Sequence, residues 1–156
     1  MKFHYKRKYA GTFGVDELTK LNAETLHAVL ATAHNDMPHA SLVAYAFDNQ
    51  EDVFIFLTPK GTSKYSNILL NPNVSLLIDR KTNTDKDYQY GEAYTFLGTA
   101  SSLRKSRRRE RLLTEFLYKH PKLKGFSREK STAVLAVEIK TAYKVTRFQE
   151  IYKFQK

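Results

Sequence analysis

The sequence contains no cysteine at any of its 156 positions, and its apolar runs are short. Without cysteine the chain can form no disulfide, thiolate nucleophile, iron–sulfur cluster or cysteine zinc site. Apolar stretches such as residues 53–57 and 74–78 are about as long as a strand and fall far short of the roughly 18 residues that a membrane span needs. These absences predict a chain without a membrane span and favour chemistry borrowed from a bound cofactor.

The chain also lacks the short motifs of several common protein classes. Its basic and aromatic start, MKFHYKRKYAGTFG, has no continuous apolar stretch and no small-residue cleavage site, so we expect a cytoplasmic protein. There is no G-x-S-x-G elbow, Walker loop or G-x-G-x-x-G segment, which leaves hydrolase, NTPase and Rossmann interpretations without support. The five histidines show no metal-site spacing, so no metal site is expected.

What the chain does contain is enough apolar and aromatic material for one core. Hydrophobic residues make up 42% of the sequence and aromatic residues 13%, and the length suits a single domain, which we assign to residues 1–156. The formal net charge is +10 at pH 7. Because Lys and Arg in such excess attract polyanions without any motif, a polyanionic partner is one hypothesis to carry forward.

The order of apolar and polar segments predicts a mainly β protein with peripheral helices. Strands are expected where β-branched and aromatic residues run between turn residues, and helices where apolar residues recur at three- or four-residue spacing. The strands lie at residues 26–33, 39–47, 53–58, 74–79, 92–101 and within 132–154, the helices at 15–22 and within 62–72 and 106–121, and an exposed loop at 80–88. About six or seven strands with about three helices in this order fit an antiparallel β-barrel.

The segment FLTPKGTSKYSN carries the groups that a terminal phosphate needs. A strand ends at Thr58, and after a glycine turn a helix begins near Ser63 and Lys64. A helix N-terminus offers free N–H donors and a partial positive charge, to which the lysine adds a full one. The alternative is an ordinary helix cap, because Ser and Thr are common capping residues.

The preceding strand, PHASLVAYAF, has one face made mostly of small side chains. The residues on that face are Ala40, Leu42, Ala44 and Ala46. Small side chains let a flat ring lie close to the strand, where backbone N–H and C=O groups can meet the polar edge of the ring. The alternative is that a helix packs closely against this face.

A basic cluster opens the longest predicted helix. It comprises Arg104, Lys105, Arg107, Arg108, Arg109 and Arg111. Positive charge at a helix N-terminus opposes the macrodipole, so compensation by another group is expected. A carboxylate of a dimer neighbour, a bound phosphate or a nucleic acid would each provide it, and a solvated run of charge is the remaining alternative.

Three stretches, read in order, carry a resemblance to a known family. They are LATAHNDMPHASLVAYAF, VFIFLTPKGTSKYSNILLNPNVSLLID and EAYTFLGTA, and the most specific part is the strand ending in Thr58, the glycine turn, S-K-x-x-N and N-P-x-V-S-L-L. Over residues 26–101 the chain resembles the pyridoxamine 5′-phosphate oxidase-like family of FMN-binding split barrels. The closing strands fit less specifically. The resemblance implies a split antiparallel β-barrel of the FMN-binding type and FMN as the cofactor.

The same resemblance implies which residues hold the flavin. Ser63 and Lys64 would hold the FMN phosphate with Thr58 nearby, and the backbone of residues 41–44 would run along the isoalloxazine ring. Because members bind flavin at a dimer interface, a homodimer with shared sites is implied, with residues 99–101, Phe126 and Phe148 on the partner's side. The implied flavin-binding residues are Ser41, Leu42, Val43, Ala44, Leu57, Thr58, Thr62, Ser63, Lys64, Thr99, Phe126 and Phe148.

Departures from the family's pattern narrow the implied function. Enzymes that oxidise pyridoxine phosphate carry a C-terminal R-x-H segment, and a Tyr and an Arg that bind the substrate phosphate. Here Phe116 and His120 stand at the positions of the Tyr and the Arg, Ala93 replaces a glutamine near the ring, and no R-x-H segment occurs. Vitamin B6 oxidation is therefore not expected.

Three functions remain as hypotheses. The first is an FMN-dependent oxidoreductase or flavin reductase, in which the flavin serves a small-molecule electron donor or acceptor and no side chain is singled out as catalytic. The second is a non-catalytic module that holds FMN, a deazaflavin or haem, with His39 or His120 as the haem ligand. The third, a nucleic-acid-binding barrel, is least favoured because the basic residues lack aromatic stacking partners.

Overall fold

The computed structural model describes residues 6–9, 14–148 and 150–155. The strands are β1 (Lys6–Tyr9), β2 (His27–His34), β3 (Met37–Asp48), β4 (Val53–Pro59), β5 (Asn73–Arg80), β6 (Glu92–Ser102), β7 (Thr132–Thr146) and β8 (Glu150–Gln155). The helices are α1 (Val15–Glu24), α2 (Ser63–Leu70), α3 (Asp87–Tyr90), α4 (Arg107–Lys119), the 3₁₀ turn η1 (Pro121–Leu123) and α5 (Lys124–Ser127). No helix among these residues is long and apolar enough to cross a bilayer.

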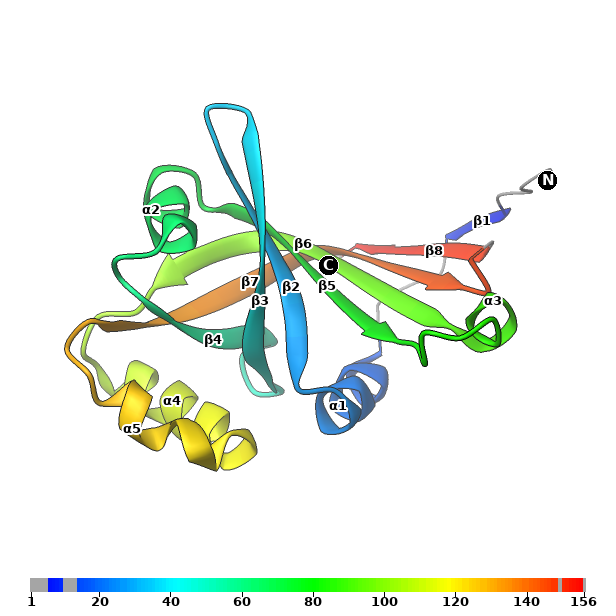
Figure 1. Cartoon of the computed structure of the whole chain (residues 1–156). Coiled ribbons are helices and arrows are strands. Elements are labelled where there is room, and N and C mark those ends of the chain that lie inside the picture. The colour runs from blue at the N-terminus through cyan, green and yellow to red at the C-terminus, as the bar shows by residue number, and fades with distance from the viewer. Residues whose placement is uncertain (1–5, 10–13, 149, 156) are drawn as a thin grey trace.

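The strands form one sheet that closes on itself. Its order is β1-β8-β7-β4-β3-β2-β5-β6, and an additional pairing of β6 with β7 closes the barrel. Every pairing is antiparallel except that of β1 with β8. The predicted split antiparallel β-barrel with peripheral helices is thus confirmed, and Figure 1 shows the β2–β3 hairpin rising from it.

The structure adds elements that the sequence patterns do not predict. The basic N-terminus contributes β1, so the described residues form eight strands. Within the predicted loop at 80–88, the backbone N–H groups of Thr82 and Asn83 donate to the Asp87 carboxylate at 2.8 and 2.7 Å, which orders the single turn of α3. Elements as short as α3 and α5 are too brief to show an apolar period.

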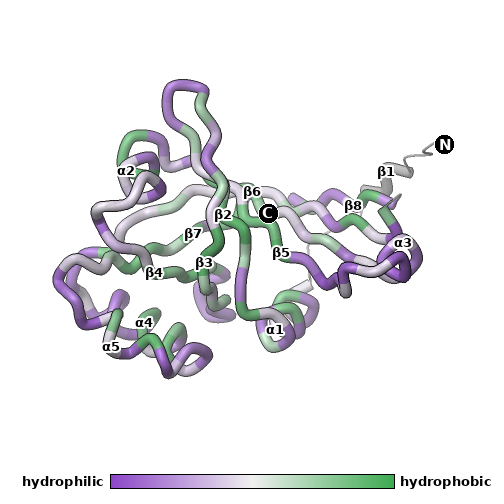
Figure 2. The backbone as a smooth tube through the Cα atoms, in the orientation of Figure 1, coloured by the Kyte–Doolittle hydropathy of each residue, from purple (hydrophilic) through white to green (hydrophobic). Residues whose placement is uncertain are grey.

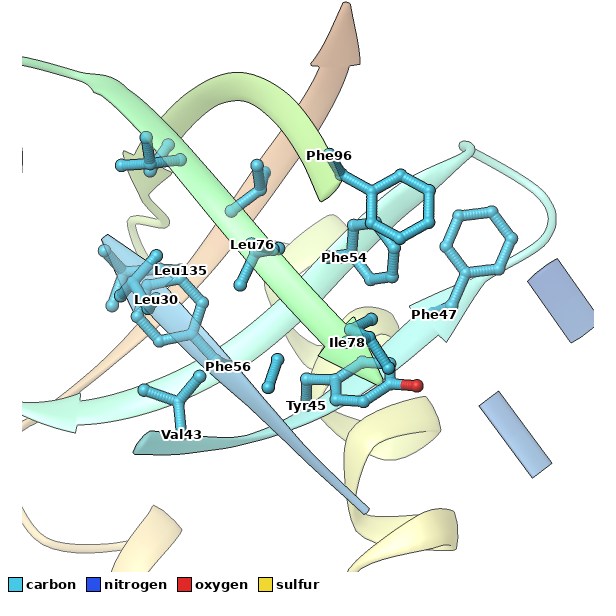
Figure 3. Packing of buried hydrophobic residues seen from close by; sticks show 14 of the residues in the cluster. Leu30, Val43, Tyr45, Phe47, Phe54, Phe56, Leu76, Ile78, Phe96 and Leu135 are labelled. Atoms are coloured by element: carbon cyan, nitrogen blue, oxygen red, sulfur yellow. The ribbon is translucent and has the colours of Figure 1, made fainter. Parts of the chain in front are cut away.

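Aromatic side chains fill the barrel. Phe54 and Phe96 are essentially unexposed and their ring centroids are 4.8 Å apart, while Phe47 lies 5.2 Å from Phe54 on the other side. Figure 3 shows these three rings gathered on one side of the cluster, with Leu30 and Leu135 beside Phe56 on the other side. Such tilted contacts are favourable beyond the area that they bury, so this cluster stabilises the barrel.

A second apolar cluster lies outside the barrel under α4. Leu112 and Phe116, both fully buried, pack against Ala46 and Ile55 on the outer face of β3 and β4. The Ser106 hydroxyl caps α4 by accepting from the Arg109 N–H at 3.1 Å. In Figure 2 the hydrophobic stretches of α4 face the sheet side and its ends are hydrophilic.

One glycine is required by a close backbone approach. The β6–β7 register shifts between Leu97 and Gly98, and a Cβ at Gly98 would lie 2.1 Å from the Glu138 carbonyl oxygen. Only glycine fits at this bulge, which bends the two longest-paired strands around the core.

Candidate active site at the split between β3 and β4

Two neighbouring strands separate where the predicted flavin residues lie. The β3–β4 ladder runs only from Asp48↔Val53 to Tyr45↔Phe56. Beyond that point β3 continues to Met37 paired with β2 alone, and β4 continues to Pro59 paired with β7 alone. Residues 40–44 and 57–59 therefore present strand edges on the two sides of a split, which opens toward α2 in Figure 1.

The far side of this split is the turn that leads into α2. Thr58 is 1% exposed, and its hydroxyl lies 3.0 Å from that of Thr62, which donates to the Pro59 carbonyl at 2.9 Å and accepts from the Tyr65 N–H at 3.4 Å. The ordinary-cap interpretation is thus correct for Thr62. It leaves Ser63 exposed and Lys64 half-buried, and neither side chain has a hydrogen-bond partner among the described residues.

The position of α2 is fixed by the barrel. Ile68 inserts into the main core at 3% exposure, and the Asn67 amide donates to the Thr32 hydroxyl on β2 at 3.1 Å. Because β2 pairs with β3 along residues 37–44, these contacts hold the start of α2 at a set place relative to the near side of the split.

The near side of the split has a buried hydroxyl without a partner. Ser41 Oγ is buried and makes no hydrogen bond with any described residue. On the opposite face of β3, Ala40 and Leu42 are exposed, whereas Ala46 is buried under α4. The alternative of helix packing therefore holds for Ala46 and for the half-buried Ala44, whereas the exposed Ala40 and Leu42 lie beside the split.

The remaining predicted flavin residues lie elsewhere in the chain. Phe126 on α5 packs against the cluster under α4, and Thr99 on β6 pairs with Asn73 of β5 and Glu138 of β7. Phe148, 52% exposed in the β7–β8 turn, lies 5.8 Å from the Tyr88 ring and lines a separate cavity of about 200 Å³ that Ala93 also lines. One chain thus brings together residues 41–44, 57–58 and 62–64, but not Phe126 or Phe148.

Two residues at the end of α4 belong to the packing of the barrel. His120 Nε2 lies 2.7 Å from the Tyr45 carbonyl, and burial lowers the pKa of His120 below its ordinary value. Lys119 stands 3.8 Å from the centre of the Tyr45 ring, and burial lowers the pKa of Lys119 to about 8. Sequence patterns miss Lys119, since a lysine in the last turn of a helix is an ordinary solvated residue.

The basic cluster of α4 is compensated in part by carboxylates of the same chain. Arg111 contacts Asp48 at 2.7 Å and Glu51 at 2.6 Å, and Arg108 contacts Glu51 at 2.6 Å. Burial opposes ionisation of Asp48, but hydrogen bonds from Arg111 and from the Glu51 N–H outweigh it, so the pKa of Asp48 lies below its usual value. The β3–β4 turn thus neutralises two of the arginines. It is not among the sources of compensation that the sequence suggests.

Comparisons with known proteins agree with this geometry. A family model described as pyridoxamine 5′-phosphate oxidase matches residues 15–146. A Schizosaccharomyces pombe protein named as a pyridoxamine 5′-phosphate oxidase homolog is 34% identical over 113 residues, which are 65% of this chain and 60% of that protein. The chain therefore spans less than two thirds of the length of that relative.

Solved structures share the fold at low sequence identity. A heme-binding protein from Mycobacterium smegmatis has a TM-score of 0.78 at 16% identity, over 89% of this chain and 56% of that one. An FAD-binding protein from Mesorhizobium loti has a TM-score of 0.67 at 14% identity, over 85% and 94% of the two chains. Proteins with this fold thus include flavin-binding and haem-binding examples. With a split antiparallel barrel and a family match over most of its length, the chain belongs to the pyridoxamine 5′-phosphate oxidase family.

Proposed function

We propose that the chain binds FMN in the split between β3 and β4 and acts as an FMN-dependent oxidoreductase or flavin reductase. The observation that carries this proposal is that polar side chains without partners occur on both of the segments that border the split. Ser41 Oγ is buried without a partner on one side, and Ser63 and Lys64 have uncommitted side chains on the other. A buried hydroxyl without a hydrogen bond is costly, so a ligand that satisfies it is favoured.

The residues fit the two chemically different ends of FMN. Ser63 and Lys64, at the start of α2, would hold the phosphate with donors and a positive charge. The edge of β3 at residues 40–44 has no β4 ladder to satisfy it, so its backbone groups are placed to meet the polar edge of the isoalloxazine ring. When bound, FMN supplies hydride or electron transfer, and the chain orients the ring and limits its contact with water.

A homodimer is part of this proposal. The outer face of the barrel beside the split carries Leu42 at 67% exposure and Leu77 and Leu97 at 38% each. Register places Val29 between Leu42 and Leu77, which makes the strip continuous across three strands. A second copy on this strip would bury it and would bring its own Phe148 and Thr99 to the flavin.

The direct test is an absorption spectrum of protein purified from cells, followed by mass analysis of the ligand that heating releases. Bands near 370 and 450 nm with the mass of FMN are expected, together with reduction of the bound flavin by NADH or NADPH. If no donor reduces the bound flavin and no acceptor takes electrons from it, the protein binds FMN without catalytic turnover. A colourless protein that also takes up no added FMN would overturn the proposal.

The phosphate site has a test of its own. Lys64→Ala is expected to weaken FMN binding by about 1–3 kcal/mol, the range for a lost hydrogen bond to a charged group. Lys122→Ala is the matched control, since it removes the same charge from an exposed position in η1. Fluorescence titration with FMN measures both variants, and equal affinities would show that the phosphate lies elsewhere.

Haem is the second candidate ligand, favoured by the fold shared with a heme-binding protein. His39, exposed on β3 next to the small-residue face, is the available ligand, whereas His120 is engaged by the Tyr45 carbonyl. Haem binding predicts a Soret band that His39→Ala abolishes and His34→Ala keeps. Loss of the band in neither variant would remove His39 as the ligand.

A further inference from the structure

A second cleft lies among α4, α5 and the start of β7, and it reaches the turn that leads into α2 at Lys60 and Tyr65. Its volume is about 790 Å³, within the range of small-molecule sites. Its lining residues are Lys60, Tyr65, Ser102, Leu103, Arg104, Lys105, Arg109, Glu110, Leu113, Thr114, Leu117, Lys124, Ser127, Arg128, Glu129, Lys130, Thr132, Ala133 and Val134. Seven of these are Lys or Arg and two are Glu, so the lining has a formal charge of +5.

The positive charge of this cleft is mostly uncompensated. Arg109 contacts the exposed Glu110 at 2.7 Å, and Lys60 donates to the Lys130 carbonyl, which is neutral, at 3.3 Å. Arg104 and Lys105 have no ion-pair partner among the described residues. Like charges gathered around a concave surface repel one another and attract an anion.

A buried hydroxyl in the lining has no partner. Thr132, at the first position of β7, is 4% exposed, and its Oγ1 makes no hydrogen bond with any described residue. Its N–H is satisfied by the Glu129 carbonyl at 3.0 Å, so the hydroxyl alone is left over. Ser41 is the only other residue in this condition among the described side chains, and an unsatisfied buried hydroxyl in a basic cleft indicates a polar ligand group beside it.

The remaining wall of the cleft is apolar. Leu113 and Val134 are buried, Leu103 and Leu117 are half-buried, and the half-buried Tyr65 ring adds a flat surface. A bare phosphate would leave this wall in contact with water. A ligand with several negative charges and an aromatic body covers both surfaces, which is the chemistry of a nucleotide.

We propose that this cleft binds a nucleotide with at least two phosphates. The phosphates lie among Arg104, Lys105 and Arg109, the Thr132 hydroxyl bonds to a polar group of the ligand, and the base covers the apolar wall. Lys64 is not in the lining, so this site differs from the proposed flavin phosphate site, although Lys60 and Tyr65 belong to the same turn and helix as Lys64.

The test is calorimetric titration of the purified protein, saturated with FMN where it takes FMN up, with ADP at low and at moderate salt. We expect one ADP per chain, with affinity that falls as salt screens the charges. The double variant R104Q/K105Q should weaken ADP binding at least about tenfold. Arg107→Gln, which removes the same kind of charge from an exposed residue of α4 outside the lining, should weaken it less than about twofold.

Thr132 provides a test that charge alone would not move. Thr132→Val should weaken ADP binding several-fold with no change in salt dependence, and Thr132→Ser should restore it, since only serine keeps the hydroxyl. Thermal unfolding of each variant checks that the fold is kept. Equal ADP affinity in the Val and Ser variants would overturn the assignment of Thr132.

Other outcomes would overturn the proposal that this cleft binds a nucleotide. No heat with ADP at low salt would overturn the proposal, as would equal losses from R107Q and from R104Q/K105Q. Lys64→Ala should weaken FMN binding and leave ADP affinity unchanged. Displacement of FMN by ADP would overturn the proposal, because it would make the cleft a part of the flavin site. Binding of a single-stranded RNA oligonucleotide that ADP does not displace would instead assign the surface to nucleic acid.

Discussion

The two ends of β4 are built differently, although residues 53–58 are all buried. At the Val53 end the strand has ladder partners on both sides, and the adjoining turn is fastened to α4 by Asp48 and Glu51. At the Pro59 end the strand pairs with β7 alone, and the side chains that follow are hydroxyls and two lysines. Both ends of β4 are therefore buried, but only at the Val53 end are the polar groups fully paired.

We call the Val53 end of β4 the closed end and the Pro59 end the open end. The closed end serves stability, and in the proposed function the open end serves the ligand. The closed end has apolar contacts and short ion pairs with nothing left over, as a folding core requires. The open end is held as firmly, through Ile68 and Asn67, yet it leaves a buried hydroxyl unbonded on β3. A rigid frame around unsatisfied groups is what a pre-organised binding site needs.

The largest expected effect comes from removing an aromatic ring at the closed end. Phe54→Ala should lower the free energy of unfolding by about 3–5 kcal/mol, the range for truncating a buried Phe, because its ring contacts Tyr45, Phe47 and Phe96. Urea denaturation measures this change. FMN affinity of the folded variant should stay within about twofold, since an apolar core substitution away from the site changes stability rather than ligand contacts. Loss of FMN binding without loss of stability would mean that Phe54 serves the ligand and not the core.

The ion pair beside the closed end should have the next largest effect. Arg111→Met leaves Asp48, whose side chain is 3% exposed, without its main donor, so a loss of about 1–3 kcal/mol is expected. Because the folded pKa of Asp48 is lowered, its contribution is present above the ordinary carboxyl pKa and is lost as pH falls through the lowered value. The free energy of unfolding, measured at several pH values from neutral to acid, should show this loss in the native protein and not in Arg111→Met. Arg107→Met, without an ion pair among the described residues, is the control expected to change stability by less than about 0.5 kcal/mol.

Lys119 lies over the ring of Tyr45, whose pairing with Phe56 is the last of the β3–β4 ladder before the split. Its pKa is about 8 in the folded protein, below that of an unfolded lysine, so the unfolded chain binds more protons between these values. Stability should therefore rise with pH from about 8 to about 10.4, by at most about 1.4 kcal/mol per pH unit. In Lys119→Met this rise should disappear, as urea titrations at several pH values would show. Parallel pH profiles for the two proteins would mean that the lysine is solvated.

Sequence patterns recover the barrel because each strand carries its own apolar, β-branched signal between turns. The strand predicted at 53–58 and the helix within 62–72 correspond to Val53–Pro59 and Ser63–Leu70. The pairing of Arg111 with Asp48 escapes them, since 63 residues separate the two and only the folded barrel brings them together. Thr132 escapes for the same reason, because an unbonded hydroxyl is a property of its surroundings and not of its neighbours in sequence.

The smallest change in stability is expected at the open end, from the loss of the Thr58 hydroxyl. Thr58→Val keeps the shape of a buried side chain and removes the hydroxyl that lies 3.0 Å from Thr62. Because Thr62 keeps its bond to the Pro59 carbonyl, stability should fall by only about 0.5–1.5 kcal/mol, the usual net value of one neutral hydrogen bond. If the hydroxyl also orders the turn for the FMN phosphate, affinity for FMN should fall by a similar amount, and Thr58→Ser should restore both. If the variant loses stability but binds FMN with unchanged affinity, Thr58 has a role in stability alone. The phosphate site would then be confined to residues 62–64.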